Sequence, residues 1–333
     1  MLTDLFQNIE NLGIKLLDCN HVKFKEHWVD FVLDNKENLP VNYSLESYEY
    51  QESYFFERED FDNYSKILVM KNKPIAVWPI FRLNKKYTCY GGDLCMPYIS
   101  NKVSLAVQKN LSKQVINSYF KLLLADSPSS LRFEINNRFT SEALSVAYIS
   151  GIQPIIGFEQ WVNLNDPLDT IFSQIRKSYK SLINQSSRLF NINIHTFVNC
   201  ELWEKFKLFH FQQSGRSTRS VYTWEIQKQH VNSRRAILAT VQDKDGSYLG
   251  FALFNFNEFG AVYAVAAYDR EKFDLPIAHG IQWEAIKYFK ENGLKEYLIG
   301  YLPSFQELDS KQFNIARFKM GFGQTRPFLR LMR

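Results

Sequence analysis

Two arginines and several hydroxyl side chains follow a glycine in "FHFQQSGRSTRSVYTWEIQ", residues 209–227. Gly215 is expected to end a helix, so Arg216 and Arg219 fall on the following loop. A guanidinium group binds a carboxylate or a phosphate through two parallel hydrogen bonds, and hydroxyl groups complete such a shell. Trp224 offers an apolar wall for a sugar or an acyl chain. The segment predicts a substrate-binding edge; the alternative is a surface loop packed by Trp224.

The segment "YDREKFDLPIAHGIQWE", residues 268–284, joins a strand to a helix. Pro276 suits the first helical turn, and the N–H groups at a helix N-terminus attract an acyl carbonyl, a phosphate or a carboxylate. His279 is a candidate general base because its unperturbed pKa lies near neutrality. Glu284 is a second candidate catalytic group, and Trp283 is a candidate substrate contact. The alternative for His279 and Glu284 is a surface or structural hydrogen-bonding role.

Three further candidates stand at the end of the preceding strand. Tyr268 is a candidate catalytic group, and Asp269 and Arg270 are candidate substrate contacts. All three are predicted to point toward a ligand where the sheet opens. An ordinary polar cluster at a strand end is the alternative.

The run "RKSYKS", residues 176–181, predicts a basic helical face. Arg176, Tyr179 and Lys180 share one side of such a helix. Arg176 and Lys180 stand four residues apart, so their like charges repel unless an anion bridges them. A phosphate or carboxylate on the acceptor would do so, and a solvated basic face is the alternative.

Two cationic residues flank "GFG" near residue 322. Lys319 and Arg326 are candidates for stabilising a leaving group or for binding phosphate. A closing β-hairpin with no functional role is the alternative.

The chemistry that these residues suit is direct transfer of an acyl group to an amine. Such a transfer needs a neutral amine, a polarised carbonyl and a protonated leaving group, and it requires neither a metal nor a covalent intermediate. The sequence has no GxSxG, no HExxH, no CxxC and no Cys/His set at zinc spacing. We therefore expect no metal site and no permanently bound cofactor.

Composition narrows the class of protein further. The chain has 333 residues, of which 45% are hydrophobic and 16% aromatic, so disorder is not expected. The net charge of +5 is mild and interspersed, which argues against nonspecific nucleic-acid binding. The N-terminus lacks a signal-peptide pattern, and the apolar run "AVYAVAAY" is too short to cross a bilayer. We expect a soluble, cytoplasmic protein with no membrane insertion.

The elements that must position the candidates occur twice along the chain. In each half a short strand and an amphipathic helix precede paired strands, and Asp245-Gly246 supplies a hairpin turn in the second half. Each half then offers a helix, a strand, a short helix and a terminal strand. Corresponding segments lie about 165 to 178 residues apart. They are 14–18 and 192–197, 24–37 and 202–213, 65–84 and 235–256, 107–126 and 276–293, 130–135 and 295–300, and 144–164 and 313–332.

This order predicts an α/β fold with mixed, largely antiparallel sheets and flanking helices, built as two tandem domains. We expect residues 1–165 to form a degenerate N-terminal domain and residues 166–333 to form the domain with the active site. A strand that follows a helical crossover is expected to pair in parallel at the centre, where the sheet parts and admits a ligand. No GxGxxG or GxxxxGKS follows a strand, which argues against dinucleotide and P-loop folds.

The second half resembles the FemAB-type transferases, which carry two units of the Gcn5-related acetyltransferase (GNAT) fold. The resemblance is carried, in order, by "IRKSYKSLINQSSRLFNINI", "SGRSTRSVYTW", "AYDREKFDLPIAHGIQWEAI", "YLIGYL" and "IARFKMGFGQTRP". The first half matches only in pattern. The chain lacks the long helical hairpin arm of some peptidoglycan-branching members and a clear RxxGxG/A pyrophosphate loop.

The resemblance implies an acyl- or aminoacyltransferase that forms an amide on an amino group of a bacterial cell-envelope or surface-glycan precursor. The donor would be acyl-CoA or aminoacyl-tRNA, and the acceptor an amino sugar or a nucleotide sugar. Two alternatives stay open: a noncatalytic protein that binds glycans or nucleotide sugars, and a transferase with a protein or peptide acceptor.

Overall fold

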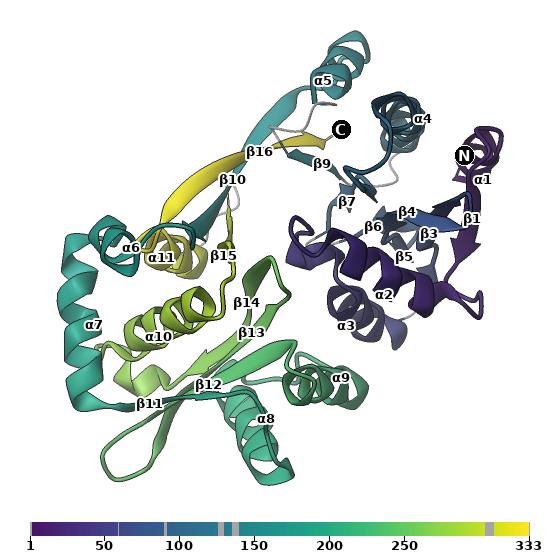
Figure 1. Ribbon diagram of the computed structural model, residues 1–333. Coiled ribbons are helices and arrows are strands. Elements are labelled where there is room, and N and C mark those ends of the chain that lie inside the picture. The colour runs from purple at the N-terminus through teal and green to yellow at the C-terminus, as the bar shows by residue number, and fades with distance from the viewer. Residues whose placement is uncertain are drawn as a thin grey trace. The chain divides into compact units, whose positions relative to one another are not determined.

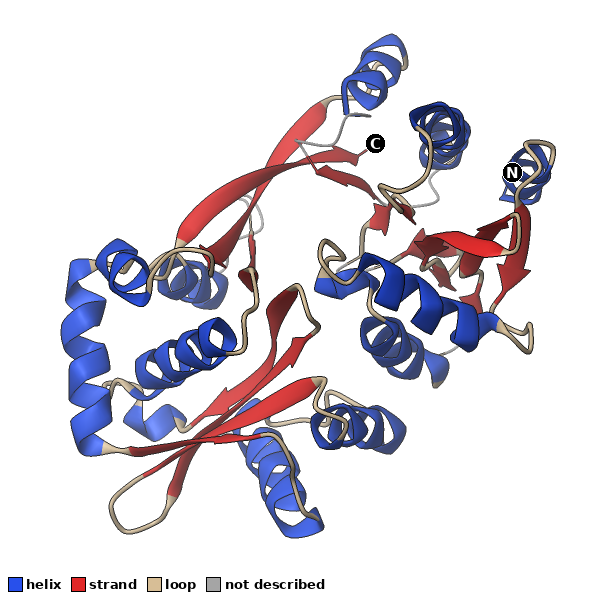
Figure 2. Cartoon of the chain, in the orientation of Figure 1, coloured by secondary structure: helices blue, strands red, loops and turns tan. Residues whose placement is uncertain are grey.

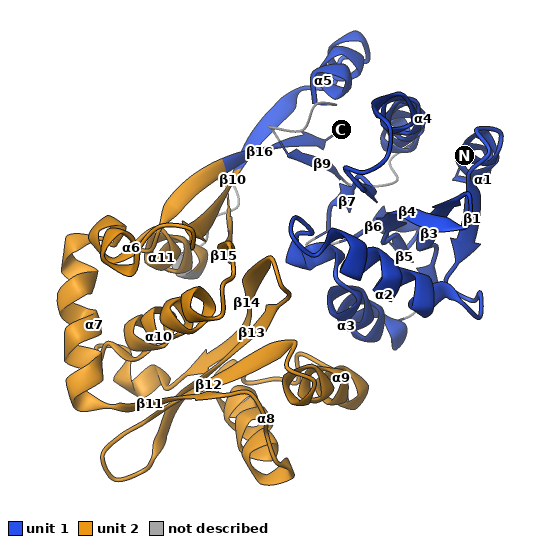
Figure 3. Cartoon of the chain, viewed as in Figure 1, with its two compact units in different colours: residues 1–157, 327–333 blue, residues 158–326 orange. Residues whose placement is uncertain are grey.

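The computed structural model describes residues 2–58, 60–89, 92–125, 130–134, 140–303 and 310–332, the side chains of residues 310 and 311 excepted. The chain divides into two units, each a mixture of helices and strands (Figures 1 and 2). Unit 1 comprises Met1–Gly157 and Pro327–Arg333, and unit 2 comprises Phe158–Arg326 (Figure 3). The expected mixed α/β fold with two domains is therefore present.

Unit 1 packs helices on both faces of an antiparallel sheet. Its helices are α1 (Leu2–Glu10), α2 (Phe24–Asn35), the 3-10 turn η1 (Val41–Tyr43), α3 (Leu45–Phe56), α4 (Leu105–Leu124) and α5 (Thr140–Ile149). Its strands are β1 (Lys15–Asp18), β2 (Asp62–Asn63), β3 (Lys66–Met70), β4 (Lys73–Trp78), β5 (Phe81–Leu83), β6 (Lys86–Thr88), β7 (Leu94–Cys95), β8 (Tyr98–Ile99) and β9 (Ser130–Glu134), with parts of β10 (Pro154–Asn163) and β16 (Gln324–Met332).

The main sheet of unit 1 has the strand order β1-β3-β4-β8, and β2, β5 and β6 form a second small sheet. Successive residues of β3 enter different cores, because strand side chains alternate between faces. Leu68 joins the core under α1 and α4, whereas Ile67 and Val69 join the core under α2 and α3. Burial on both faces explains why β3 reads as a continuous apolar run.

Unit 2 repeats this plan. Its helices are α6 (Leu168–Gln174), α7 (Lys177–Leu189), α8 (Cys200–Ser214), α9 (Val221–Asn232), the 3-10 turn η2 (Arg270–Lys272), α10 (Ile277–Glu291) and α11 (Ser310–Lys319). Its strands are β11 (Asn191–His195), β12 (Ala236–Gln242), β13 (Tyr248–Phe256), β14 (Gly260–Tyr268) and β15 (Glu296–Leu302), with the remainder of β10 and β16.

The strand order in unit 2 is β11-β12-β13-β14-β15-β10. Helices α7 and α10 cover one face of the sheet and α8 and α9 cover the other (Figure 1). The hairpin between β12 and β13 turns at Asp245-Gly246 as predicted, and Gly246 has φ +88°, which favours glycine. Helix α9 was not predicted. It begins at an N-cap, Ser220, whose side chain accepts a hydrogen bond from the Thr223 N–H.

The terminal strands of the two repeats are exchanged between the units. The later residues of β10, which close the first repeat in sequence, pair with β15 of unit 2. The last residues of β16, which close the second repeat, pair with β9 of unit 1. The chain therefore passes from one unit to the other at two points, between residues 157 and 158 and between residues 326 and 327. Sequence periodicity led us to expect one boundary, between residues 165 and 166.

Candidate active site

Strands β14 and β15 pair only at their beginnings. Their parallel pairing covers three residue pairs, of which the last is Val262 with Leu298. β14 continues to Tyr268 and β15 continues to Leu302. The expected parallel pair is present, and the two strands part beyond Leu298.

Four rings from α7, α10 and the end of α11 form an aromatic cluster. Tyr179 meets His279 edge-on, with ring centroids 4.4 Å apart and planes at 87°. Phe322 lies 5.3 Å from Tyr179, and Phe318 lies 5.3 Å from His279. A Cβ atom at position 321 would stand 1.9 Å from the Tyr179 ring, so only Gly321 fits there. We call Tyr179, His279, Phe318 and Phe322 the aromatic cluster.

His279 is a neutral imidazole in this environment. Its Nδ1 and Nε2 atoms are buried and have no hydrogen-bond partner among the described residues. Burial lowers the pKa of His279 to about 4, because the charged form loses its hydration. The sequence suggested a base with a pKa near neutrality, and the structure corrects that value. His279 is uncharged at physiological pH and remains able to accept a hydrogen bond or a proton.

The amine of Lys319 stands where β14 and β15 have parted. Its Nζ atom donates a hydrogen bond of 3.0 Å to the carbonyl oxygen of Tyr301. A Cβ atom at Gly300 would come within 3.0 Å of the same Nζ atom. Burial lowers the pKa of Lys319. Lys319 is therefore a more acidic ammonium than a solvated lysine.

Arg176 joins the same group of residues. It is the N-cap of α7, and its N–H donates to the carbonyl of Gly321 at 3.0 Å. Its guanidinium carbon lies 4.9 Å from the centroid of the Tyr179 ring, and Nη1 donates to the Tyr179 hydroxyl at 3.3 Å. Three predicted site residues, Arg176, Tyr179 and His279, thus come together from the start of α7 and from α10.

Lys180 and Trp283 lie around a different ring, that of Phe172 in α6. Trp283 packs 4.9 Å from Phe172, and the Lys180 Nζ atom lies 5.8 Å from the same ring. Lys180 Nζ also donates to the carbonyl of Ser173 at 2.9 Å. Protein groups hold Lys180 toward α6, so a bridging anion between Arg176 and Lys180 is not required.

Tyr268 belongs to a buried hydroxyl network beside α10. Its hydroxyl lies 2.9 Å from that of Tyr263, and the Tyr297 hydroxyl donates to Gln282 Oε1 at 2.6 Å. Burial raises the pKa of Tyr268 well above its ordinary value and that of Tyr263 to about 12. Tyr268 therefore keeps its proton at physiological pH and is suited to donate a hydrogen bond.

A β-bulge makes this network possible. Tyr263 and Tyr268 are five residues apart, and such a spacing puts side chains on opposite faces of a regular strand. In β14, however, Val265 pairs with Leu253 and Tyr263 pairs with Phe254, which leaves one extra residue between them. The extra residue shifts the register by one and brings both hydroxyls together. Sequence spacing alone gave no signal for Tyr263 as a partner of Tyr268.

Glu284, Asp269 and Arg270 lie outside this group. Glu284 pairs with Lys287 one helical turn later, at 2.8 Å. Asp269 caps η2, because its Oδ1 atom accepts from the Glu271 N–H at 3.0 Å. Arg270 is exposed, and its N–H donates to Gln213 Oε1 at 3.1 Å. These contacts match the structural alternatives that the sequence left open.

The two arginines after α8 differ in their surroundings. Gly215 is the C-cap, with φ 71°, as expected. Arg216 is exposed, and no side-chain partner for it occurs in the described part of the chain. The Arg219 guanidinium lies 5.5 Å from the ring of Trp224, which is only 7% exposed and belongs to the core under α8 and α9. Trp224 is therefore not an exposed wall for a ligand, and Arg216 is the accessible cation.

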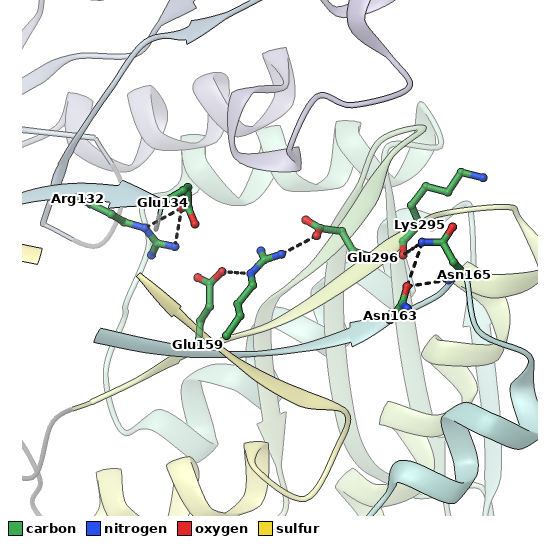
Figure 4. Close-up of polar contacts among 8 residues, drawn as sticks. Arg132, Glu134, Glu159, Asn163, Asn165, Lys295 and Glu296 are labelled. Atoms are coloured by element: carbon green, nitrogen blue, oxygen red, sulfur yellow. Dashed lines mark hydrogen bonds and ion pairs between the residues drawn. The ribbon is translucent and has the colours of Figure 1, made fainter. Parts of the chain in front are cut away.

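Arg326 is held by two carboxylates. Its Nε atom lies 2.5 Å from Glu159 Oε1, and its Nη1 atom lies 2.7 Å from Glu296 Oε2. Figure 4 shows Glu159 and Glu296 pointing toward the guanidinium group between them. Burial alone would lower the pKa of Arg326, but the two carboxylates raise it. A buried ion-pair role explains this residue better than phosphate binding.

Among the described residues no group of three or more His, Cys, Asp or Glu side chains is arranged to hold a metal ion. Within the same residues no helix is long and apolar enough to span a membrane.

No protein-family model matches the sequence, and no curated protein matches it. Solved structures do match. FemX aligns with a TM-score of 0.62 at 13% identity, over 95% of this chain and 96% of FemX. The chain has a FemX-like fold.

Two other structures support the FemX-like fold. The C-terminal domain of a protein described as a lysylphosphatidylglycerol synthetase from Agrobacterium fabrum aligns with a TM-score of 0.59 at 10% identity, over 92% of each chain. L-PGS from Bacillus licheniformis aligns with a TM-score of 0.58 at 13% identity, over 92% of this chain and 91% of its own. The resemblance to FemAB-type proteins is confirmed at the level of the fold.

Proposed function

We propose that the protein is an acyltransferase whose active site lies in unit 2 and whose product is an amide. The donor is an activated acyl or aminoacyl group on coenzyme A or tRNA. The acceptor is an amino group of an amino sugar in a bacterial cell-envelope or surface-glycan precursor. The FemX-like fold and the names of its structural relatives support this assignment, and both donor types would locate the reaction in the cytoplasm.

One observation carries the proposal. Tyr179 and His279 meet edge-on between α7 and α10, and the adjacent Lys319, at the end of α11, donates to the carbonyl of Tyr301, in the part of β15 that lies beyond its pairing with β14. The amine of Lys319 and the ring of His279 each have a lowered pKa. A buried ammonium and an uncharged imidazole are the two groups that amide formation needs, one to give a proton and one to accept it.

The proposed reaction is a direct displacement. The neutral amine of the acceptor attacks the acyl carbonyl carbon, forming the C–N bond, and the C–S bond to coenzyme A or the C–O bond to tRNA then breaks. The amine's proton passes to the uncharged ring of His279. The Lys319 ammonium gives a proton to the departing thiolate or alkoxide, and its lowered pKa makes it a stronger acid for that step. Proton exchange with solvent restores both groups.

Two arginines of unit 2 suit anionic substrates. Arg176 presents its guanidinium beside Tyr179, next to the aromatic cluster. Arg216 is exposed on the loop after α8. Coenzyme A, tRNA and nucleotide sugars all carry phosphates, which guanidinium groups bind bidentately. We assign both arginines to substrate binding.

The test is transfer by the purified full chain. The protein is incubated with acetyl-CoA or with a mixture of charged tRNAs, together with a panel of free and nucleotide-linked amino sugars. Mass spectrometry then detects any amide. Wild-type protein should form one, and Lys319→Met should lower its rate at least a hundredfold, whereas the exposed-turn variant Lys244→Met should match the wild type.

Each alternative result of this assay would support a different conclusion. Transfer to a protein or peptide acceptor alone would keep the enzyme class and replace the acceptor. Binding of amino sugars or nucleotide sugars in a thermal-shift assay, with no transfer from either donor, would favour the noncatalytic alternative. Full activity of Lys319→Met would remove the proposed site.

A further inference from the structure

Unit 1 contains a pocket that the proposed reaction does not use. Its volume is about 470 Å³. Its lining comes from α1, the start of β3, the β5–β6 hairpin and the C-terminal end of α4, and consists of Leu2, Thr3, Phe6, Tyr64, Lys66, Arg82, Lys85, Tyr87, Leu122 and Ala125. The floor is apolar, because Leu2 and Leu122 belong to the core under α1 and α4. This volume is typical of pockets that bind small organic molecules.

The charged side chains that line the pocket are all cationic. They are Lys66, Arg82 and Lys85. Asp62 pairs with Arg82 but does not line the pocket. Positive charge in the lining of a pocket attracts anions.

Arg82 has donor capacity left over. One terminal nitrogen is bound by Asp62, whereas the Nε atom is buried and has no hydrogen-bond partner among the described residues. Buried donors in proteins are normally satisfied, so an unpaired one needs an explanation. An anion seated against Arg82 would supply the missing acceptor.

Aromatic rings hold the cations in position. The Lys66 Nζ atom lies 4.9 Å from the Phe6 ring centroid, and the Arg82 guanidinium carbon lies 5.6 Å from that of Tyr64. Tyr64 and Tyr87 meet edge-on at 5.6 Å. Arg82 and Tyr87 are cross-strand partners in the hairpin, so their side chains share one face. Such rings also offer flat apolar surface to a ligand.

The turn of the hairpin brings Lys85 to the rim. Asn84 and Lys85 both have positive φ values, 50° and 66°, as a two-residue hairpin turn requires. The turn between β3 and β4 has the same form, with Lys71 and Asn72 at 51° and 63°. Lys71 does not line the pocket, which makes it a matched control for Lys85.

We propose that this pocket binds a small organic phosphate, with the phosphate against Arg82, Lys66 and Lys85 and a ring or other apolar group against Phe6, Tyr64 and Tyr87. The site is independent of the transfer reaction in unit 2. Its ligand is bound and not chemically changed.

Isothermal titration calorimetry of the full chain tests the proposal with three probes. Phenyl phosphate carries both features, inorganic phosphate carries only the anion, and phenol carries only the ring. Phenyl phosphate should bind at least tenfold more tightly than either fragment. Arg82→Gln should weaken its binding at least tenfold, and Lys85→Asn, which keeps a residue that tolerates positive φ, should weaken it at least threefold.

Lys71→Asn serves as the control and should bind phenyl phosphate as the wild type does. Equal affinity of wild type and Arg82→Gln for phenyl phosphate would overturn the proposal. Loss of binding in Arg216→Gln, with Arg82→Gln unaffected, would move the anion site to unit 2 and overturn it as well.

Discussion

The ring of His279 stands edge-on against the ring of Tyr179, with centroids 4.4 Å apart and both imidazole nitrogens buried without a partner among the described residues. The histidine is thereby held in its uncharged form. Protonation would put a charge among three aromatic rings, where water is displaced. The arrangement links the protonation of His279 to the stability of the fold, since the same burial governs both.

Acidification should destabilise the protein through its buried histidines. Burial lowers the pKa of His279 and of His210 to about 4 from an ordinary value of 6.5. Between these values the unfolded chain binds more protons than the folded one, so stability falls as pH drops below 6.5. The free energy of unfolding should fall by about 2 kcal/mol per histidine between pH 7.5 and pH 5.0.

Urea unfolding at the two pH values measures this loss. His279→Gln should lower this pH-dependent loss by about 2 kcal/mol, the contribution of one buried histidine. An identical loss in wild type and His279→Gln would show that the imidazole is not buried as described.

Gly321→Ala should destabilise unit 2 by about 1–3 kcal/mol. The new Cβ atom would lie 1.9 Å from the Tyr179 ring, which must then move against its neighbours. Chemical denaturation measures the cost. Tyr179→Leu should relieve it, so the double variant should be more stable than the sum of the two single effects predicts. Strict additivity would contradict the contact.

Substitution of Arg216 should affect substrate binding, whereas substitution of Arg219 should affect stability. Arg216→Gln should change the melting temperature by no more than about 1 °C, because exposed side chains contribute little. It should raise the KM of an anionic substrate at least tenfold. Arg219→Gln should lower stability by about 1 kcal/mol, since it removes a guanidinium from the ring of Trp224. Unfolding of Arg216→Gln would instead make the loop a structural element.

Removal of Arg326 should be costly. Glu159 is only 2% exposed in its side chain, and Arg326→Met would take away the guanidinium group that lies 2.5 Å from its buried carboxylate. The expected loss is about 3–5 kcal/mol. The surface pair Arg235–Glu258, with side chains 33% and 39% exposed, is the matched control. Arg235→Met should cost at most about 1 kcal/mol.

A second variant makes the Arg326 prediction specific. The double variant Glu159→Gln/Arg326→Met also removes the negative charge of the Glu159 carboxylate. It should therefore be more stable than Arg326→Met alone. If the double variant is no more stable than Arg326→Met, the carboxylate is not the source of the loss.

Local signals in the sequence were sufficient for much of the fold. Gly215 marked the end of α8 and Asp245-Gly246 marked the hairpin, because each needs a backbone conformation that glycine adopts readily. The apolar periodicity predicted α2, α8 and α10. Helix α9 was missed because its N-cap, Ser220, lies in a run of hydroxyl residues that also suits a loop.

The site was less predictable, because proximity between segments has no local signature. Sequence reasoning identified Tyr179 and His279 separately, but not that their rings meet. It also assigned Trp224 to ligand binding, although this tryptophan is buried in the core under α8 and α9. Environment, not residue type, shifts the pKa of His279, and a one-residue bulge in β14 decides which tyrosine faces Tyr268.

The exchanged terminal strands reverse the order in which the units reach completion during synthesis. Residues of unit 1 leave the ribosome first, yet the strand that pairs with β9 lies at residues 328–332, beyond all of unit 2. At ordinary translation rates the β9 edge therefore waits roughly 10–40 s for its neighbour. Unit 2 has its full sheet by then, since β10 was already made. The part of the chain that is made second is the first able to finish folding, and a nascent chain stalled in unit 2 would display an open strand edge to chaperones and to other chains.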